Sequence, residues 1–336
     1  MMDLNIIWFV LITVLFIGFF FLEGFDYGVG ILLPFLGKTD TERRIIINTI
    51  GPVWDGNEVW MITAGGALFA AFPHVYATMF SSFYLALFLM LLALIARGVT
   101  FEFRSKDDSP TWRNTWDWTL CISSAIPALL WGVAVTNLIQ GIAINEKMIY
   151  VGTFFDLLTP YTIIGGLAFL FVFIFHGAMF LSLRIENTNM IANVRDISLK
   201  VGIVAAASFV ACMILTYTNT DLFSSSLAAI SLILAAILFV AGYAFAWLKK
   251  YTLGFIMSSL AIVLTTIAFF AGLFPRLMVS SLNPAWSLDI YNASSSVYTL
   301  QIMTVAALCL VPVVLIYQGW TYWVFRKRVT AKNLEY

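Results

Sequence analysis

Long stretches of the sequence contain no Asp, Glu, Lys or Arg, and these stretches mark the predicted helices. They cover 4–22, 59–96, 118–145, 157–183, 201–220, 222–248, 251–275 and 290–325. A helix needs roughly 20 apolar residues to cross a bilayer core. The 59–96 stretch is long enough for two helices, and Phe72-Pro73-His74 predicts a tight turn between them. The pattern therefore predicts nine membrane-spanning helices: 6–35, 52–72, 77–99, 116–138, 160–183, 200–218, 223–247, 252–273 and 299–325. We expect Pro52 to open the second of them, at a position where no backbone donor is lost.

The composition excludes a water-soluble protein. Hydrophobic residues make up 61% of the 336 residues and charged residues only 11%, against about 25% charged in a typical globular protein. The 18 basic residues balance 18 acidic ones, so net charge indicates no nucleic-acid partner. We therefore expect an all-α, polytopic integral membrane protein that forms a single transmembrane domain over 1–336.

The distribution of basic residues predicts the orientation of this domain. Lys and Arg are enriched in the cytoplasmic loops of membrane proteins. Of the 18 basic residues, all except Lys147 and Arg276 fall in alternate predicted loops or in the C-terminal segment. This assignment counts Arg97 with the loop after the third predicted helix, although residue 97 falls in the last turn of that helix. The N-terminus is therefore predicted outside and the C-terminus inside, which requires an odd number of helices.

Four acidic residues toward the cytoplasmic side of the first two predicted helices are the candidate functional groups, because a charge within the membrane costs at least a few kcal/mol unless it is paired or hydrated. Glu23 and Asp26 are three residues apart on the first predicted helix, and Asp55 and Glu58 have the same spacing on the second. Each pair should share a helix face. No cation is evident beside them in the sequence, which favours a hydrated, proton-exchanging path entered from the cytoplasm.

Other interpretations of the polar residues remain open. Asp55 and Glu58 could be acids in a first helical turn that face the lipid headgroups and are favoured by the helix dipole. Asp117 is expected to be an interfacial anchor at the inner end of its helix, or alternatively a second acid on the proton route. His74 and His176 could each be a haem ligand, although hydrogen bonding to neighbours is the interpretation we favour. No arrangement of His, Cys and Met predicts several redox centres in this chain.

Several motifs in this sequence resemble subunit II of the cytochrome bd-type quinol oxidases. They cover nearly the whole chain, and the stretch from Trp54 to Ala71 is the most specific. The matching segments are Glu23-Gly-Phe-Asp-Tyr-Gly-Val-Gly30, Asp40-Thr-Glu-Arg-Arg44, Trp54-Asp-Gly-Asn-Glu-Val-Trp-Met-Ile-Thr-Ala-Gly-Gly-Ala-Leu-Phe-Ala-Ala71, Trp112-Arg-Asn-Thr-Trp-Asp-Trp118, Asn137-Leu-Ile-Gln-Gly141, Phe274-Pro275, Ala293-Ser-Ser295 and Val311-Pro312.

The resemblance implies a fold of two four-helix bundles plus one peripheral helix, in a bacterial cell membrane. It implies a heterodimer with a subunit I of homologous fold, which carries two b-type haems, one d-type haem and the quinol site and reduces dioxygen to water. Subunit II carries no haem or metal in this family, and it scaffolds subunit I. Some such complexes contain a small third subunit, and nothing in this sequence indicates one.

The resemblance also implies roles for individual residues. The Trp-Asp-Gly-Asn motif supplies a carboxylate to the cytoplasmic proton path, which places Asp55 there, with Trp54 and Asn57 in support. Asp26 is its expected neighbour, and the two could share a proton. Glu23 and Glu58 complete the expected path, and some family members carry an amide at the position of Glu58.

Two other functions are compatible with the same acids. A proton-coupled secondary transporter would use buried carboxyl groups as coupling sites, although such proteins usually have broken helices at the membrane midplane. A purely structural scaffold subunit would share the fold and the partner but would have no proton path.

Overall fold

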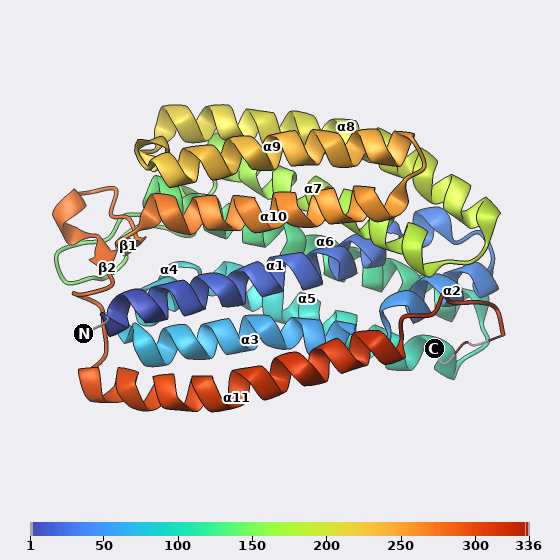
Figure 1. The fold of residues 1–336 in the computed structure, drawn as a ribbon, viewed down its shortest axis with the longest axis horizontal. Helices are drawn as coiled ribbons and strands as arrows, with labels where there is room; N and C mark the ends of the chain where they lie inside the picture. Colours follow the sequence, from blue (N-terminus) through green and yellow to red (C-terminus); the bar gives the residue numbers. More distant parts are fainter. Residues whose placement is uncertain (1–2, 333, 335–336) are drawn as a thin grey trace.

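The computed structural model describes residues 3–332 and 334, and most of them are helical (Figure 1). The helices are α1 (Leu4–Leu36), α2 (Asp40–Ile50), α3 (Trp54–Ala71), α4 (Pro73–Ser82), α5 (Tyr84–Phe103), α6 (Pro110–Gln140), α7 (Pro160–Arg184), α8 (Thr188–Asn219), α9 (Ser226–Trp247), α10 (Tyr251–Leu273) and α11 (Val297–Val324). Short 3₁₀ turns cover Arg104–Lys106, Phe154–Leu157, Leu222–Ser224 and Pro284–Trp286. Two short strands, β1 (Arg276–Met278) and β2 (Leu288–Asp289), pair antiparallel.

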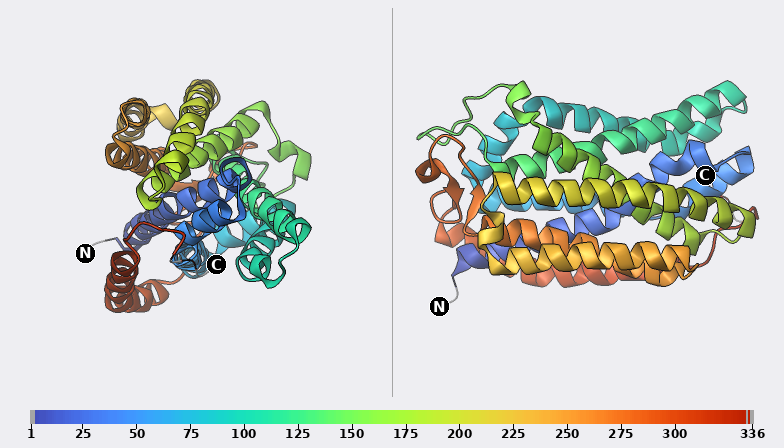
Figure 2. Two further views of the ribbon diagram at one scale, coloured as in Figure 1. Left: turned by 90° about the vertical axis from the view of Figure 1, so that its right-hand side faces the viewer. Right: turned by 90° about the horizontal axis from the view of Figure 1, so that it is seen from above.

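Helix α1 lies at the centre of the bundle. It packs against α3, α6, α7 and α10, and the end-on view of Figure 2 shows the other helices arranged around it. Helices α8, α9 and α10 lie on one side of α1, and α3 and α11 lie on the other (Figure 1). Because α1 has neighbours on all sides, its second half is almost entirely buried, including its polar residues.

Within the described part of the chain, eight helices are long and apolar enough to cross a membrane. They are α1, α5 with the following 3₁₀ turn, α6, α7, α8, α9, α10 and α11. Helix α3 is not among them, because Asp55, Asn57 and Glu58 make its first turns polar. The chain is therefore a polytopic membrane protein. Helix α1 begins at one end of the bundle, and α11 ends at the opposite end (Figure 1).

The predicted helices occur where expected, but several boundaries were wrong. The predicted loop after the first helix contains α2, an amphipathic helix that buries Ile46 and Ile50 and begins at a capping box of Thr39 and Glu42. Its charged residues removed it from the apolar windows. Pro52 lies in the turn before α3 and does not open the helix.

The helix predicted at 77–99 is divided into two, and two other helices are longer than predicted. Phe83 separates α4 from α5. Helix α6 begins at Pro110 and α8 begins at Thr188, both within segments that were assigned to loops because they are polar. A search for uncharged stretches does not detect a polar helical turn that lies beyond the apolar window.

The two longest connections pack together at the end of the bundle where the chain starts. The Ile142 amide donates to the Val279 carbonyl at 3.0 Å, and the Thr78 hydroxyl donates to the Met148 carbonyl at 2.6 Å. These contacts join the 139–159 connection to the segment containing β1 and to α4. The connections therefore form an ordered cap at this end.

Helices α1 and α7 cross with almost no side-chain volume between them. A Cβ atom added at Gly28 would lie 2.0 Å from the Phe173 carbonyl oxygen, and one at Gly177 would lie 2.6 Å from the Gly28 carbonyl carbon. Small residues allow such close backbone contact between membrane helices. This contact holds the polar half of α1 against α7.

We expect Gly28→Ala to destabilise the protein by about 1–3 kcal/mol, because the added methyl group forces the two backbones apart. Gly319→Ala on α11 is the matched control, since nothing lies within 4 Å of a Cβ atom at that position. Thermal unfolding of the detergent-solubilised protein measures both. Equal stability of the two variants would show that this helix contact is not tight.

A network of ion pairs ties α2, α5 and α6 together at the other end of the bundle. Asp117 on α6 is fully buried and accepts from Arg43 at 2.7 Å and from Arg104 at 2.6 Å. Asp40 accepts from Arg104 and Arg113, both at 2.9 Å. Asp117 was expected to be an interfacial anchor, and the structure places its carboxylate inside the protein. Its carboxylate is buried because two guanidinium groups from other helices neutralise it.

Asp117→Asn should lower the free energy of unfolding by about 3 kcal/mol, because it leaves two arginines without their buried counter-charge. Asp108→Asn is the control, since the Asp108 side chain is 99% exposed although it also contacts an arginine, Arg113. The unfolding midpoints of both variants in detergent test this expectation. A midpoint for Asp117→Asn that equals that of the control would exclude a stabilising role for the network.

Candidate functional site

Helix α1 carries two acidic side chains into the interior of the bundle. Glu23 and Asp26 are both 0% exposed, as is the neighbouring Tyr27. The spacing of three residues places the two carboxyl groups on one face of the helix, as predicted. Because the surrounding helices are apolar, these carboxyl groups need partners or water to be stable there.

The polar first turns of α3 divide into an exposed part and a buried part. Asp55 is exposed, whereas Asn57 is buried and the Glu58 side chain is 16% exposed. Trp54 is partly buried and stacks on Phe101 of α5, with ring centroids 4.6 Å apart. The four predicted acids therefore do not form a single group, because Asp55 points away from the interior that holds the others.

Arg97 is the counter-ion of the buried acids, and the sequence interpretation missed it. Its side chain is 0% exposed, and its Nη1 lies 2.7 Å from Glu23 Oε1 and 3.2 Å from Glu58 Oε2. Arg97 had been assigned to a cytoplasmic loop because the charge-free window ends at residue 96. Helix α5 instead continues for about two turns beyond that window, to Phe103, and carries Arg97 inside the bundle.

Aromatic rings enclose the Arg97 guanidinium. Its central carbon lies 5.0 Å from the centroid of the Tyr27 ring and 5.7 Å from that of Trp54, within the range of cation–π attraction. Tyr27, Trp54 and Arg97 come from three different helices. The cation therefore connects α1, α3 and α5 through both charge and ring contacts.

The buried cluster contains more acidic groups than this one arginine can neutralise. Glu23, Asp26 and Glu58 surround Arg97, and full ionisation of all three would leave a net negative charge in the interior. Several buried atoms have no hydrogen-bond partner among the described residues: Glu23 Oε2, Asp26 Oδ1, Tyr27 OH, and Arg97 Nε and Nη2. Such an arrangement favours bound protons or internal water molecules. It is chemically suited to holding and exchanging protons.

Asp26 has a different partner from the one that the sequence suggested. Its Oδ2 accepts from Asn57 Nδ2 at 2.6 Å, and no contact between Asp26 and Asp55 is seen among the described residues. The Asn57 Oδ1 in turn accepts from Gln318 Nε2 at 3.2 Å and from the Tyr322 hydroxyl at 2.8 Å. Gln318 and Tyr322 lie on α11, more than 250 residues away in sequence, and no local pattern pointed to them.

The two histidines occupy different environments. His176 on α7 is 0% exposed, its Nδ1 lies 2.8 Å from the Ser258 hydroxyl, and its Nε2 lies 3.2 Å from the Phe21 carbonyl. This confirms the interpretation of His176 as a residue hydrogen-bonded to its neighbours. His74 is exposed at the start of α4. In the part of the chain that the structure describes, no three His, Cys, Asp or Glu side chains are grouped so that they could hold a metal ion.

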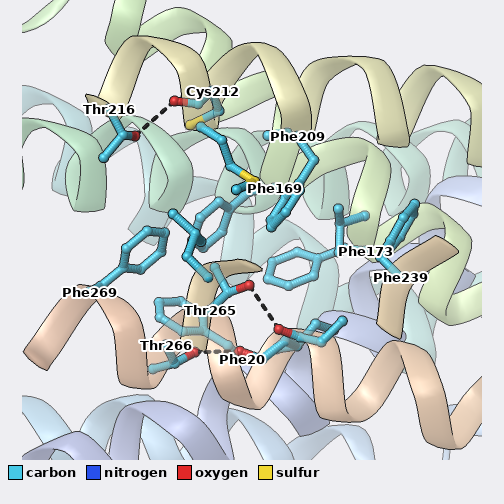
Figure 3. Close-up of a pocket in the computed structure, with 16 residues that line it drawn as sticks. Phe20, Phe169, Phe173, Phe209, Cys212, Thr216, Phe239, Thr265, Thr266 and Phe269 are labelled. Atoms are coloured by element: carbon cyan, nitrogen blue, oxygen red, sulfur yellow. Dashed lines mark hydrogen bonds between the residues drawn. The ribbon is translucent and has the colours of Figure 1, made fainter. Parts of the chain in front are cut away.

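An apolar pocket lies between α7, α8, α9 and α10, apart from the acidic cluster (Figure 3). Phe169, Phe173, Phe209 and Phe269 form much of its wall. The hydroxyl groups at its edge are those of Thr216, Thr265 and Thr266, and each donates to a carbonyl of its own helix. The pocket therefore offers an apolar surface with no ionised group, and it adds nothing to proton exchange.

Comparison with known proteins identifies the family. The model for "Cytochrome bd terminal oxidase subunit II" matches residues 4–325. The chain is 43% identical to "Cytochrome bd ubiquinol oxidase subunit 2" of Bacillus subtilis, over 99% of both chains. It is 37% identical to "Cytochrome bd-I ubiquinol oxidase subunit 2" of Escherichia coli K12, over 99% of this chain and 97% of the relative.

A solved structure has the same fold. A chain of "The structure of bd oxidase from Geobacillus thermodenitrificans" superposes with a TM-score of 0.79 at 15% identity, covering 97% of this chain and 100% of that one. At this identity the likeness concerns the fold alone. The family match and the curated relatives together show that the chain belongs to the cytochrome bd terminal oxidase subunit II family.

Proposed function

We propose that this chain is the haem-free subunit II of an electrogenic quinol:dioxygen oxidoreductase in a bacterial cytoplasmic membrane. It scaffolds a subunit I that carries two b-type haems, one d-type haem and the quinol site, and it is not catalytic by itself. The family match over residues 4–325 and the names of the relatives support membership in such a complex. The finer assignments extend the family resemblance to this chain.

The proposed topology has nine spans in one transmembrane domain, with the N-terminus outside and the C-terminus in the cytoplasm. Helix α3 is the ninth span, because it runs beside α1 and is joined to α5 through α4. Two four-helix bundles and α11 as the peripheral helix account for the nine. The basic residues near the end of α11 agree with a cytoplasmic C-terminus.

In this proposal, the acids of α1 and α3 form part of the route that carries cytoplasmic protons to the oxygen-reducing haem. The observation that carries it is the surplus of buried carboxyl groups around Arg97, with the exposed Asp55 one helical turn from Glu58. A carboxylate on a membrane helix is costly against lipid. We therefore expect subunit I to cover Asp55. Asp55 would then transfer protons from this chain to subunit I.

The reduction of dioxygen explains why the complex needs a proton route. Reduction of one dioxygen to two water molecules consumes four protons and four electrons, and quinol supplies the electrons. If quinol releases its own protons outside while water formation draws protons from inside, charge is separated without a pump. Asp26, Glu23 and Glu58 would hold and pass protons, and Trp54 and Asn57 would keep the acids in place.

We expect Asp55→Asn to lower quinol-driven oxygen consumption and charge separation by at least about tenfold, because an amide cannot relay a proton. Asp55→Glu keeps the carboxyl group and should retain most of the activity. The assembled complex, purified from its membrane and reconstituted in vesicles, is the sample. A reduced-minus-oxidised haem spectrum confirms that each variant still binds its partner.

The control for a change at the first turn of α3 is Thr63→Val, which removes an exposed hydroxyl that donates only to its own helix, at the Val59 carbonyl. Unchanged turnover and charge separation in Asp55→Asn, with normal haem bands, would remove Asp55 from any obligatory route. A scaffold without a proton path would then require the same result for Asp26→Asn.

A further inference from the structure

A chain of hydrogen bonds connects the peripheral helix α11 to Asp26. Trp60 Nε1 on α3 donates to Gln318 Oε1 at 2.7 Å. Gln318 Nε2 donates to Asn57 Oδ1 at 3.2 Å, and Asn57 Nδ2 donates to Asp26 Oδ2 at 2.6 Å. This series of hydrogen bonds therefore runs from α3 to α11, back to α3 and on to α1.

The Trp60 indole fixes which group donates and which accepts at each hydrogen bond of this series. An indole N–H can only donate a hydrogen bond, so Gln318 must present its oxygen to Trp60 and its NH₂ group to Asn57. Asn57 must then present its oxygen to Gln318 and its NH₂ group to Asp26. In this orientation the Tyr322 hydroxyl donates to the same Asn57 oxygen at 2.8 Å.

We propose that Trp60, Gln318 and Tyr322 are positioning residues that force Asn57 to act as a hydrogen-bond donor to Asp26. A donor held against one oxygen stabilises the ionised carboxylate relative to an arrangement in which Asn57 presents its oxygen to Asp26. This inference rests on the proposed proton path. The charged and titratable groups that also face Asp26 come from α1, α3, α5 and α11: Glu23, Tyr27, Glu58, Arg97 and Tyr322.

The attachment of α11 separates this role from a purely structural one. Leu300 is the one side chain that α11 buries fully among its described residues. Polar contacts hold the helix at two places: Gln318 and Tyr322 at its inner end, and Thr304 and the Leu300 carbonyl at its outer end, where Trp8 Nε1 donates to both at 3.1 and 3.2 Å. The outer contact holds the same helix but is remote from Asp26.

The decisive variant is Gln318→Glu combined with Tyr322→Phe, in the assembled oxidase with its partner subunit. An ionised glutamate at 318 accepts from Trp60 with one oxygen and from the Asn57 NH₂ group with the other. Asn57 then turns its oxygen toward Asp26, which can form that hydrogen bond only while it keeps its own proton. We expect the pH profile of quinol-driven oxygen consumption to move by about one pH unit toward alkaline pH.

Thr304→Val is the matched control, because it weakens the outer attachment of α11 and leaves the hydrogen bonds from Trp60 to Asp26 intact. It should leave the pH profile in place. Trp60→Phe is a second test that removes the group fixing Gln318, and it should shift the profile in the same direction by a smaller amount. It replaces the double variant if the latter fails to assemble, as judged by the haem spectrum.

The outcomes separate this inference from the proposed function. Loss of turnover at every pH without a shift of the profile, or an equal shift in Thr304→Val, would overturn the positioning role. Asp26→Asn is measured in the same series. If Asp26→Asn changes neither turnover nor its pH profile, the proposed path through Asp26 is wrong. If it abolishes turnover while the double variant and Trp60→Phe keep the wild-type profile, the inference alone is wrong.

Discussion

The buried guanidinium of Arg97 is the interaction on which the polar interior depends. It lies 2.7 Å from Glu23 of α1 and 3.2 Å from Glu58 of α3, and its own helix is α5. Removing a cation from water costs several kcal/mol, and only well-placed anions offset that cost. The three helices must therefore meet at this level of the bundle. The glycine contact between α1 and α7 then holds the opposite face of α1 in place.

The charge balance around Arg97 links this architecture to the proposed proton path. One carboxylate suffices to neutralise a guanidinium, but Glu23 and Glu58 both contact Arg97, and Asp26 brings a third carboxyl group into the same enclosure. The enclosure approaches neutrality when protons enter it, and it becomes charged again when they leave. The ion pairs of Asp117 illustrate the contrast. There three arginines, Arg43, Arg104 and Arg113, pair with three carboxylates, Asp117, Asp40 and Asp108, so that network is balanced and suits a structural joint.

Uncharged stretches and short motifs predicted the helices and the acidic residues, because both depend on neighbouring positions in the sequence. Glu23, Asp26, Asn57 and Glu58 were found in this way, and the structure brings them together. Arg97 could have been suspected, since buried acids need a counter-ion. It was assigned to a loop because a charge was taken to mark the end of a span.

The partners contributed by α11 were beyond the reach of any local pattern. Gln318 and Tyr322 meet Asn57 only through the tertiary fold, and nothing in the sequence around them distinguishes them from other polar residues of an apolar helix. The same limit applies to Asp117, whose arginines lie on other segments. The position of Asp55 on the outside of α3 also depends on how that helix is rotated within the bundle.

The place of α11 in the chain has a consequence for biosynthesis. Ribosomes make the polypeptide from its N-terminus, so Asp26 and Asn57 are inserted long before Gln318 and Tyr322 exist. Until the last helix leaves the translocon, the α11 partners of Asn57 in this hydrogen-bond network are absent. The network around Asp26 can therefore be completed only after the end of the chain has been made.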